Sequence, residues 1–175
     1  MSISSTSIFP DLDDLGSASG FVEEIVQIVA TLSLFEGFTL AECVKLCEYM
    51  KCFGARSNVT ILGEGDAGDF LVIILTGRVN VVKDSNPAQQ KLVAQMGPGG
   101  FLGEMSLVDG QSRFASCITT EPTDFAVLTR HDLNAILVDQ PRLGAKVLLL
   151  LLQLMTGRLR DATTRMLPTL LGDAI

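Results

Sequence analysis

Residues 97–116 carry the residue types of an anion-binding site and read GPGGFLGEMSLVDGQSRFAS. The glycines of this stretch permit backbone angles that bring the chain close to a ligand. Gly103 leads into residues 104–108, a run long enough for one or two helical turns, and the free amide groups that start such a turn favour a phosphate. Arg113 follows across an Asp-Gly turn, and its guanidinium can bind two phosphate oxygens at once.

Glu104 indicates a second group on the same ligand. A carboxylate repels a phosphate, but an ionised carboxylate accepts hydrogen bonds, and sugar hydroxyls can donate them. A phosphate and a ribose hydroxyl bound in one small cradle describe a nucleotide. The residues of this stretch also allow an alternative, in which Glu104 and Arg113 form a surface ion pair beside an ordinary loop.

The composition restricts the class of partner. The chain has 175 residues, which fits one domain with extensions, and its net charge of −7 argues against general affinity for nucleic acid or anionic membranes. The N-terminus lacks the pattern of a secretory signal. The leucine run at 148–152 is far shorter than the roughly 20 apolar residues that a membrane span needs. The sequence therefore predicts a cytoplasmic protein with no direct DNA binding and no membrane contact.

Catalytic and metal chemistry find little support in the residue types. The four cysteines lack C-x-x-C spacing, so we expect buried thiols in a reducing compartment rather than metal ligands shared with His131. His131 is the single histidine, and no nucleophile–base spacing surrounds it. We therefore predict no enzyme, no catalytic residue, no metal and no resident cofactor.

The elements that must position the stretch fall into consecutive segments. We expect a flexible N-terminal segment (1–20), N-terminal helices (21–50), a β unit (51–130), C-terminal helices (131–165) and a tail (166–175). The first segment is rich in Ser and Asp, which favours a loosely attached chain. In the helical segment, Thr39 and Glu42 have the spacing of a capping box.

The β unit shows short apolar runs separated by turns. The runs lie at 59–62, 70–76, 78–83, 91–96, 115–119 and 124–128. Gly77 marks a bulge or tight corner, and about eight short strands of this kind suggest a closed or sandwiched jelly roll. The predicted fold class is α+β, with an eight-stranded β jelly roll, N-terminal helices and a C-terminal helical pair that includes a long helix.

The C-terminal helices begin at Thr129, which can cap the segment 130–138 together with Asp132. A longer helix starts at Pro141 and reaches about residue 165. It carries two apolar stripes, one at 148, 151, 155 and 159 and one at 143, 147, 150 and 154. A helix that is apolar on two faces must be covered on both. The sequence therefore favours a homodimer through residues 141–165, although burial within one chain stays open.

The order of these elements resembles the cyclic nucleotide-binding domain over about residues 32–160. The resemblance rests on four motifs in order: LFEGF at 34–38, EGDAGDF at 64–70, GRV at 77–79, and FLGEMSL at 101–107 with Arg113 nine residues after Glu104. That family includes bacterial catabolite activators, kinase regulatory subunits and gated ion channels. The resemblance implies a receptor for cyclic AMP or cyclic GMP.

The resemblance also implies a role for each residue of the site. Glu104 would accept a hydrogen bond from the ribose 2′-hydroxyl, and Arg113 would pair with the cyclic phosphate. Phe114 stands where the family usually has Ala, Ser or Thr, so it could stack near the base or reshape the pocket. The implied ligand-binding residues are Gly103, Glu104, Met105, Ser106, Arg113, Phe114, Ala115 and Thr163, with Arg160 and Thr164 as further candidates near the helix end.

The bacterial activators continue into a helix-turn-helix domain, for which residues 164–175 are too few. The resemblance therefore predicts a stand-alone sensor or regulatory domain that signals through its C-terminal helix to a dimer mate or an unknown protein effector. The alternative is a degenerate cyclic nucleotide-binding fold that serves as a protein-interaction module without nucleotide. Phe114 is the residue that supports this alternative.

Overall fold

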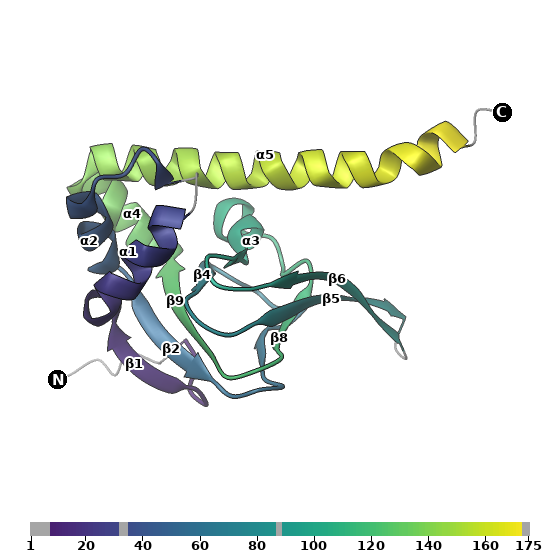
Figure 1. Ribbon diagram of the computed structural model, residues 1–175, viewed down its shortest axis with the longest axis horizontal. Helices are drawn as coiled ribbons and strands as arrows, with labels where there is room; N and C mark the ends of the chain where they lie inside the picture. The colour runs from purple at the N-terminus through teal and green to yellow at the C-terminus, as the bar shows by residue number, and fades with distance from the viewer. Residues whose placement is uncertain (1–7, 32–34, 87–88, 173–175) are drawn as a thin grey trace.

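The computed structural model describes residues 8–31, 35–86 and 89–172, and its elements form a β sandwich with helices on one side (Figure 1). The helices are a 3-10 turn η1 (Ala18–Phe21), α1 (Val22–Thr31), α2 (Leu40–Cys47), α3 (Glu104–Asp109), α4 (Arg130–Asp139) and α5 (Pro141–Gly172). The strands are β1 (Asp13–Ser17), β2 (Lys51–Ala55), β3 (Thr60–Leu62), β4 (Phe70–Ile74), β5 (Val79–Asn86), β6 (Gln89–Met96), β7 (Phe101–Leu102), β8 (Ser116–Thr119) and β9 (Thr123–Thr129).

The strands form two antiparallel sheets. One has the order β1-β2-β9-β4-β7 and the other the order β3-β8-β5-β6. Side chains alternate along each strand, so the first sheet sends Phe53, Val72 and Phe125 into a core between the sheets and Cys52, Leu71 and Ala126 toward the helices. The predicted α+β jelly roll is confirmed, with nine strands among the described residues.

The N-terminal segment differs from the expectation of a loose chain. Residues 13–17 form β1, which pairs with β2 at the edge of the first sheet although all five residues are exposed. A polar segment buries few side chains, but its backbone can still form hydrogen bonds with the free edge of a strand. Phe9 adds an anchor, because its ring makes edge contacts with the rings of Phe53, Phe70 and Phe125. Residues 1–7 lie outside the described residues.

The capping box before α2 is confirmed. Thr39 accepts the Glu42 amide proton, and Glu42 in turn accepts the Thr39 amide proton. Glu42 also forms an ion pair of 2.7 Å with Lys146 of α5, whose ammonium donates to the Gly37 carbonyl at 2.6 Å. These contacts tie the N-terminal helices to the start of α5. Residues 32–34, including the first residue of the LFEGF motif, lie outside the described residues.

Helix α5 continues past the predicted end at residue 165 and reaches Gly172, so most of the predicted tail is helical; residues 173–175 lie outside the described residues. Its first half is buried through Leu143, Val147, Leu150 and Leu151, whereas all residues from Thr156 to Leu167 are exposed. Leu151 therefore belongs with the core-facing stripe of residues 143, 147 and 150, which corrects its assignment to the stripe of residues 148, 155 and 159. Figure 1 shows α5 passing over α3 and extending beyond the domain. Among the described helices, none has a stretch long and apolar enough to cross a membrane.

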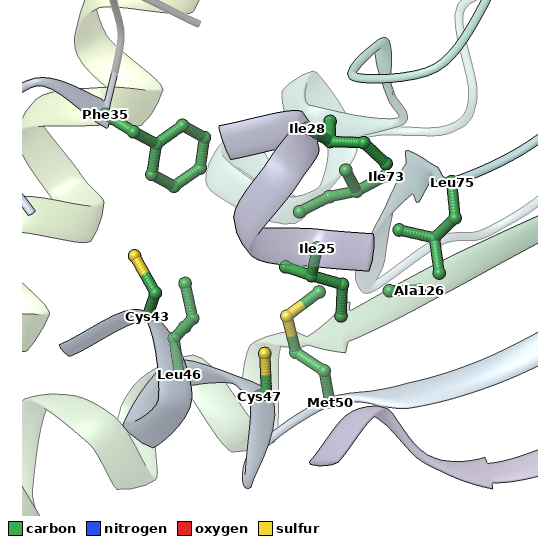
Figure 2. Close-up of a pocket in the computed structure, with 10 residues that line it drawn as sticks. All are labelled: Ile25, Ile28, Phe35, Cys43, Leu46, Cys47, Met50, Ile73, Leu75 and Ala126. Atoms are coloured by element: carbon green, nitrogen blue, oxygen red, sulfur yellow. The ribbon is translucent and has the colours of Figure 1, made fainter. Parts of the chain in front are cut away.

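A small apolar cavity of about 20 Å³ lies between α1, α2 and the first sheet (Figure 2). Its lining comprises Ile25, Ile28, Phe35, Cys43, Leu46, Cys47, Met50, Ile73, Leu75 and Ala126. The space would hold about one water, but a lining this apolar keeps a cavity dry. The cysteines are free and buried, as predicted, and burial raises the pKa of the Cys47 thiol to about 11.

Candidate ligand-binding site at α3 and Arg113

Gly103 starts the site because it is the N-cap of α3 and has a left-handed φ of 76°. Strand β7 brings the chain to this point, pairing with β4 through Phe101 and Leu102. No side chain caps α3, so the first amide groups of the helix keep their donors for a ligand. A Cβ at residue 103 would overlap the Arg113 guanidinium. Glycine is therefore required both by the backbone angle and by the approach of the arginine.

Arg113 is held rigidly from several sides and is only 4% exposed. Its amide donates to Asp66 O at 2.8 Å, its carbonyl accepts from Gly65 N at 2.9 Å, and Nη1 donates to Gly103 O at 2.9 Å. The guanidinium carbon lies 4.4 Å from the centroid of the Phe70 ring. Nη2 is buried and has no hydrogen-bond partner among the described residues. Burial lowers the pKa of Arg113. The unpaired Nη2 can donate a hydrogen bond to an anion.

The glycine turn between β3 and β4 makes room for this arginine. Gly65 has a φ of 82°, and its amide is the one bonded to the Arg113 carbonyl. A Cβ at Gly68 would overlap the Arg113 side chain. The EGDAGDF motif therefore has a physical role, because its glycines let the backbone wrap closely around Arg113.

Glu104 is buried to 1% exposure and lies beside an arginine that the sequence did not identify. Its Oε1 is 2.8 Å from Nη1 of Arg158, yet neither carboxylate oxygen has a hydrogen bond of good geometry among the described residues. The alternative of a surface ion pair between Glu104 and Arg113 is wrong, because both side chains are buried and Glu104 pairs with Arg158. A buried carboxylate with unfilled acceptor sites suits a ligand hydroxyl.

Arg158 comes from the middle of α5 and is 43% exposed. Besides Glu104, it contacts the carbonyl of Phe101, to which Nη2 donates. Sequence reasoning placed its candidates later in the helix and missed this residue. The available signal was the spacing of the core-facing stripe, since Arg158 follows Leu154 by 4 residues and Val147 by 11, steps that keep it on the same face of the helix.

The other predicted residues of α3 and β8 divide by burial. Ser106 is buried on α3, whereas the Met105 side chain is exposed. Met105 can therefore contribute its backbone amide at the helix start rather than its side chain. Ala115 is buried at the entry to β8. Gly103 therefore contacts Arg113 directly, whereas Ser106 and Ala115 are buried two residues after Glu104 and Arg113 respectively.

Phe114 lies at the rim and is 58% exposed. Lys83 of β5 donates to the Phe114 carbonyl at 2.6 Å, and its ammonium lies 4.4 Å from the centroid of the phenyl ring. Lys83 also pairs with Glu64 at 2.6 Å, and this contact lowers the pKa of Glu64. The backbone beside Arg113 is therefore fixed from β5, and the phenyl ring does not fill the interior of the site.

Thr163 is exposed on α5, more than one helical turn beyond Arg158. Its hydroxyl donates to the Leu159 carbonyl of the same helix at 2.8 Å. Among the described residues, the hydrogen bond of Thr163 is therefore made within α5, and Thr163 does not contact the predicted site residues near α3.

Comparison with known proteins agrees with this geometry. Residues 55–140 match the family model of the cyclic nucleotide-binding domain. The crystal structure of a cyclic nucleotide-binding domain from Methylobacillus flagellatus superimposes with a TM-score of 0.84 at 46% identity, covering 94% of this chain and 92% of that one.

Curated relatives are longer proteins. The cyclic AMP receptor protein of Thermus thermophilus is 33% identical over 74% of this chain, and a CRP-like cAMP-activated global transcriptional regulator of Mycobacterium tuberculosis is 24% identical over 84% of it. The chain spans 58% and 64% of the lengths of these two relatives. With a near full-length structural match, the ordered motifs and the geometry around α3, the chain belongs to the cyclic nucleotide-binding domain family.

Proposed function

We propose that the chain is a regulatory domain that binds cyclic AMP or cyclic GMP and has no catalytic activity of its own. The observation that carries the proposal is that one buried site contains both a hydrogen-bond donor and hydrogen-bond acceptors without partners among the described residues. Arg113 keeps one buried donor without a partner, and Glu104 keeps two buried acceptor oxygens without a hydrogen bond. A ligand with a phosphate and a neighbouring hydroxyl satisfies both groups at once.

The proposed roles follow from these groups. The Arg113 guanidinium and the amides at the start of α3, from Gly103 to Ser106, bind the cyclic phosphate. Glu104 accepts the ribose 2′-hydroxyl. Phe114 and Ala115 border the base, and the exposed position of the phenyl ring leaves the interior free for the nucleotide. Relatives whose names include cyclic AMP favour this nucleotide over cyclic GMP.

Arg158 links the proposed site to the output of the domain. It is bound to Glu104 and to the Phe101 carbonyl on either side of Gly103, where the ligand would lie. A ribose hydroxyl competes with Arg158 for the Glu104 carboxylate, so the ligand favours arrangements of α5 in which Arg158 has moved. Only such a difference in affinity between two arrangements can shift their populations. A partner that contacts α5 would bind the two arrangements of the helix with different affinity.

The partner we propose is a second copy of the chain, together with a protein effector in the cytoplasm. An apolar stripe at alternating spacings of three and four runs along the outer part of α5: Leu148, Leu152, Met155, Leu159, Ala162 and Met166. This is the seam of a two-stranded coiled coil. In a parallel pair, Arg158 and Thr163 flank the seam on facing sides, which gives Thr163 a route to the site of the partner subunit.

Isothermal titration tests the proposal on the whole chain with cyclic AMP, cyclic GMP and a cyclic dinucleotide. We expect saturable binding of one cyclic mononucleotide, and a loss of at least about tenfold in Arg113→Ala because a charged hydrogen bond is removed. Arg142→Ala, at an exposed position of α5, is the matched control and should bind like the unmodified chain. Absence of heat with every nucleotide would reject the proposal in favour of an interaction module without nucleotide.

A further inference from the structure

We infer that Arg130, the first residue of α4, is a positioning residue that fixes the two halves of the binding site relative to each other. The inference rests on the proposed function for its ligand but concerns a residue that none of the ligand roles above requires. One half of the site is α3 with Glu104, and the other is the glycine turn that wraps around Arg113. Arg130 contacts both halves.

The contact with α3 is made by the side chain. Nη2 of Arg130 donates to the Ser106 carbonyl at 2.6 Å, and the same carbonyl accepts the Gly110 amide at 3.0 Å. The guanidinium therefore sits at the C-terminal end of α3, where positive charge is favourable. Gly110 leaves α3 with a φ of 73°, and a Cβ there would lie 3.1 Å from Nη1 of Arg130. The end of α3 is thus shaped around this arginine.

The contact with the glycine turn is made by the backbone. The amide of Arg130 donates to the Asp69 carbonyl at 2.6 Å. Asp69 stands between Gly68, which touches the Arg113 side chain, and Phe70, whose ring lies under the Arg113 guanidinium. One residue at the head of α4 therefore spans from the end of α3 to the loop that holds Arg113.

The chemistry of Arg130 favours positioning over simple packing. Its Nε is buried and has no hydrogen-bond partner in the described part of the chain. An open hollow lined by Ala67, Gly68, Asp69, Gly110 and Arg130 lies beside it, so the side chain fills no tight core position. An unpaired buried donor costs free energy that an apolar side chain would avoid. What the arginine contributes is the charged hydrogen bond that orients α3.

Arg130 and Arg158 bind opposite ends of α3. Arg158 of α5 holds the N-terminal end of α3 through Glu104 and the Phe101 carbonyl, and Arg130 of α4 holds the C-terminal end through Ser106. The short helix that carries the ribose-binding carboxylate is therefore held at both ends by the C-terminal helical pair. In this proposal the ligand breaks the contact between Arg158 and Glu104, whereas the contact between Arg130 and the Ser106 carbonyl stays in place and holds α3.

The first test measures α3 in the ligand-free chain by amide hydrogen exchange. Arg130→Met keeps the aliphatic stem and removes the donor. Exchange at Leu107 and Gly110, whose amides donate to the Gly103 and Ser106 carbonyls, should therefore rise by about tenfold while exchange in β4 and β9 stays unchanged. Arg130→Lys should restore most of the protection, because an ammonium can still donate to the Ser106 carbonyl. Arg142→Met is the surface control. Unchanged exchange in α3 of Arg130→Met, or a uniform rise through the sheets, would overturn the inference whether or not a nucleotide binds.

The second test uses the ligand to separate positioning from general destabilisation. Arg130→Met should weaken cyclic AMP binding by about tenfold, within the usual range of coupling between sites, and weaken 2′-deoxy cyclic AMP at least about threefold less. The reason is that the deoxy ligand lacks the hydroxyl that a well-placed Glu104 accepts. Equal losses for the two ligands would contradict positioning of α3. Failure of the unmodified chain to bind either ligand would count against the proposed function, and the exchange test would then decide the inference alone.

Discussion

Nη1 of Arg158 lies 2.8 Å from Oε1 of Glu104, so the long C-terminal helix reaches directly into the buried start of α3. The two residues differ strongly in exposure, at 43% and 1% for their side chains. Glu104 is therefore an almost completely buried carboxylate, and among the described residues its ion-pair partner comes from α5, which is exposed from Thr156 to Leu167. The state of α5 and the charge environment of the site are linked through this one pair.

A double-mutant cycle measures that link. Arg158→Met should lower the free energy of unfolding by about 1–2 kcal/mol, less than the loss of a fully buried pair, because water reaches Arg158. In a Glu104→Gln background the same substitution should cost under about 0.5 kcal/mol, since no buried charge is left unpaired. Denaturant unfolding of the four proteins gives the coupling directly. Equal costs in the two backgrounds would show that Arg158 does not stabilise the Glu104 carboxylate.

The local parts of the site were predictable from sequence because short-range rules decide them. The left-handed glycine before Glu104, the short helix after it and the nine-residue step to Arg113 lie within one stretch of chain. The caps at Thr39 and Thr129 follow the same logic, and both form as predicted. These features depend on backbone geometry and on neighbouring side chains, which the residue order specifies.

The missed parts depend on contacts between distant segments. Arg158 reaches Glu104 only because α5 passes over α3 (Figure 1). The stripe spacing places Arg158 on the inner face of the helix, but no local pattern identifies Glu104 as its partner. Strand β1 forms because β2 offers a free edge, and Phe9 is held by three phenyl rings from β2, β4 and β9. Local composition describes the burial of these segments correctly, but the partner that orders them lies elsewhere in the chain.

The ion pair between Glu42 and Lys146 predicts an acid-dependent loss of stability. The hydrogen bond from Lys146, aided by the Thr39 amide, lowers the pKa of Glu42 from 4.5 to about 2. Because the folded-state pKa is the lower one, the stabilisation is complete above pH 4.5 and disappears as the pH falls toward 2. Lys146→Met should therefore flatten the stability profile across this window in denaturant melts. Lys45→Met removes an exposed helical ion pair and is the control; an equal flattening there would mean that the effect is not specific to α5.

The apolar cavity between α1, α2 and the first sheet predicts how its lining tolerates substitution (Figure 2). Met50→Ala would enlarge a space that is already empty and should lower the free energy of unfolding by about 3 kcal/mol. Met50→Leu keeps the volume and should cost under about 1.5 kcal/mol. Thermal and denaturant melts compare the two variants, and neither should change nucleotide affinity, because none of the site residues lines the cavity. A cost for Met50→Ala close to that of Met50→Leu would show that the lining collapses around the missing side chain.

The exposed stripe of α5 predicts a dimer that a single charge can break. Leu159 is among the most exposed apolar side chains of the described chain and lies at the centre of the proposed seam, so Leu159→Asp should place two carboxylates against each other across the pair. The sedimentation mass at micromolar concentration should then fall by half while the domain stays folded, with a thermal midpoint lower only by the stabilisation that pairing gave. Leu151→Asp is unsuitable for this purpose, because Leu151 is buried in the core cluster between the helices and the first sheet, where a carboxylate should destabilise the whole domain. Arg160→Asp adds a carboxylate at a neighbouring position off the seam and should leave the mass of the dimer intact. A monomer mass for the unmodified chain, or dissociation of Arg160→Asp as well, would show that α5 does not pair along this stripe.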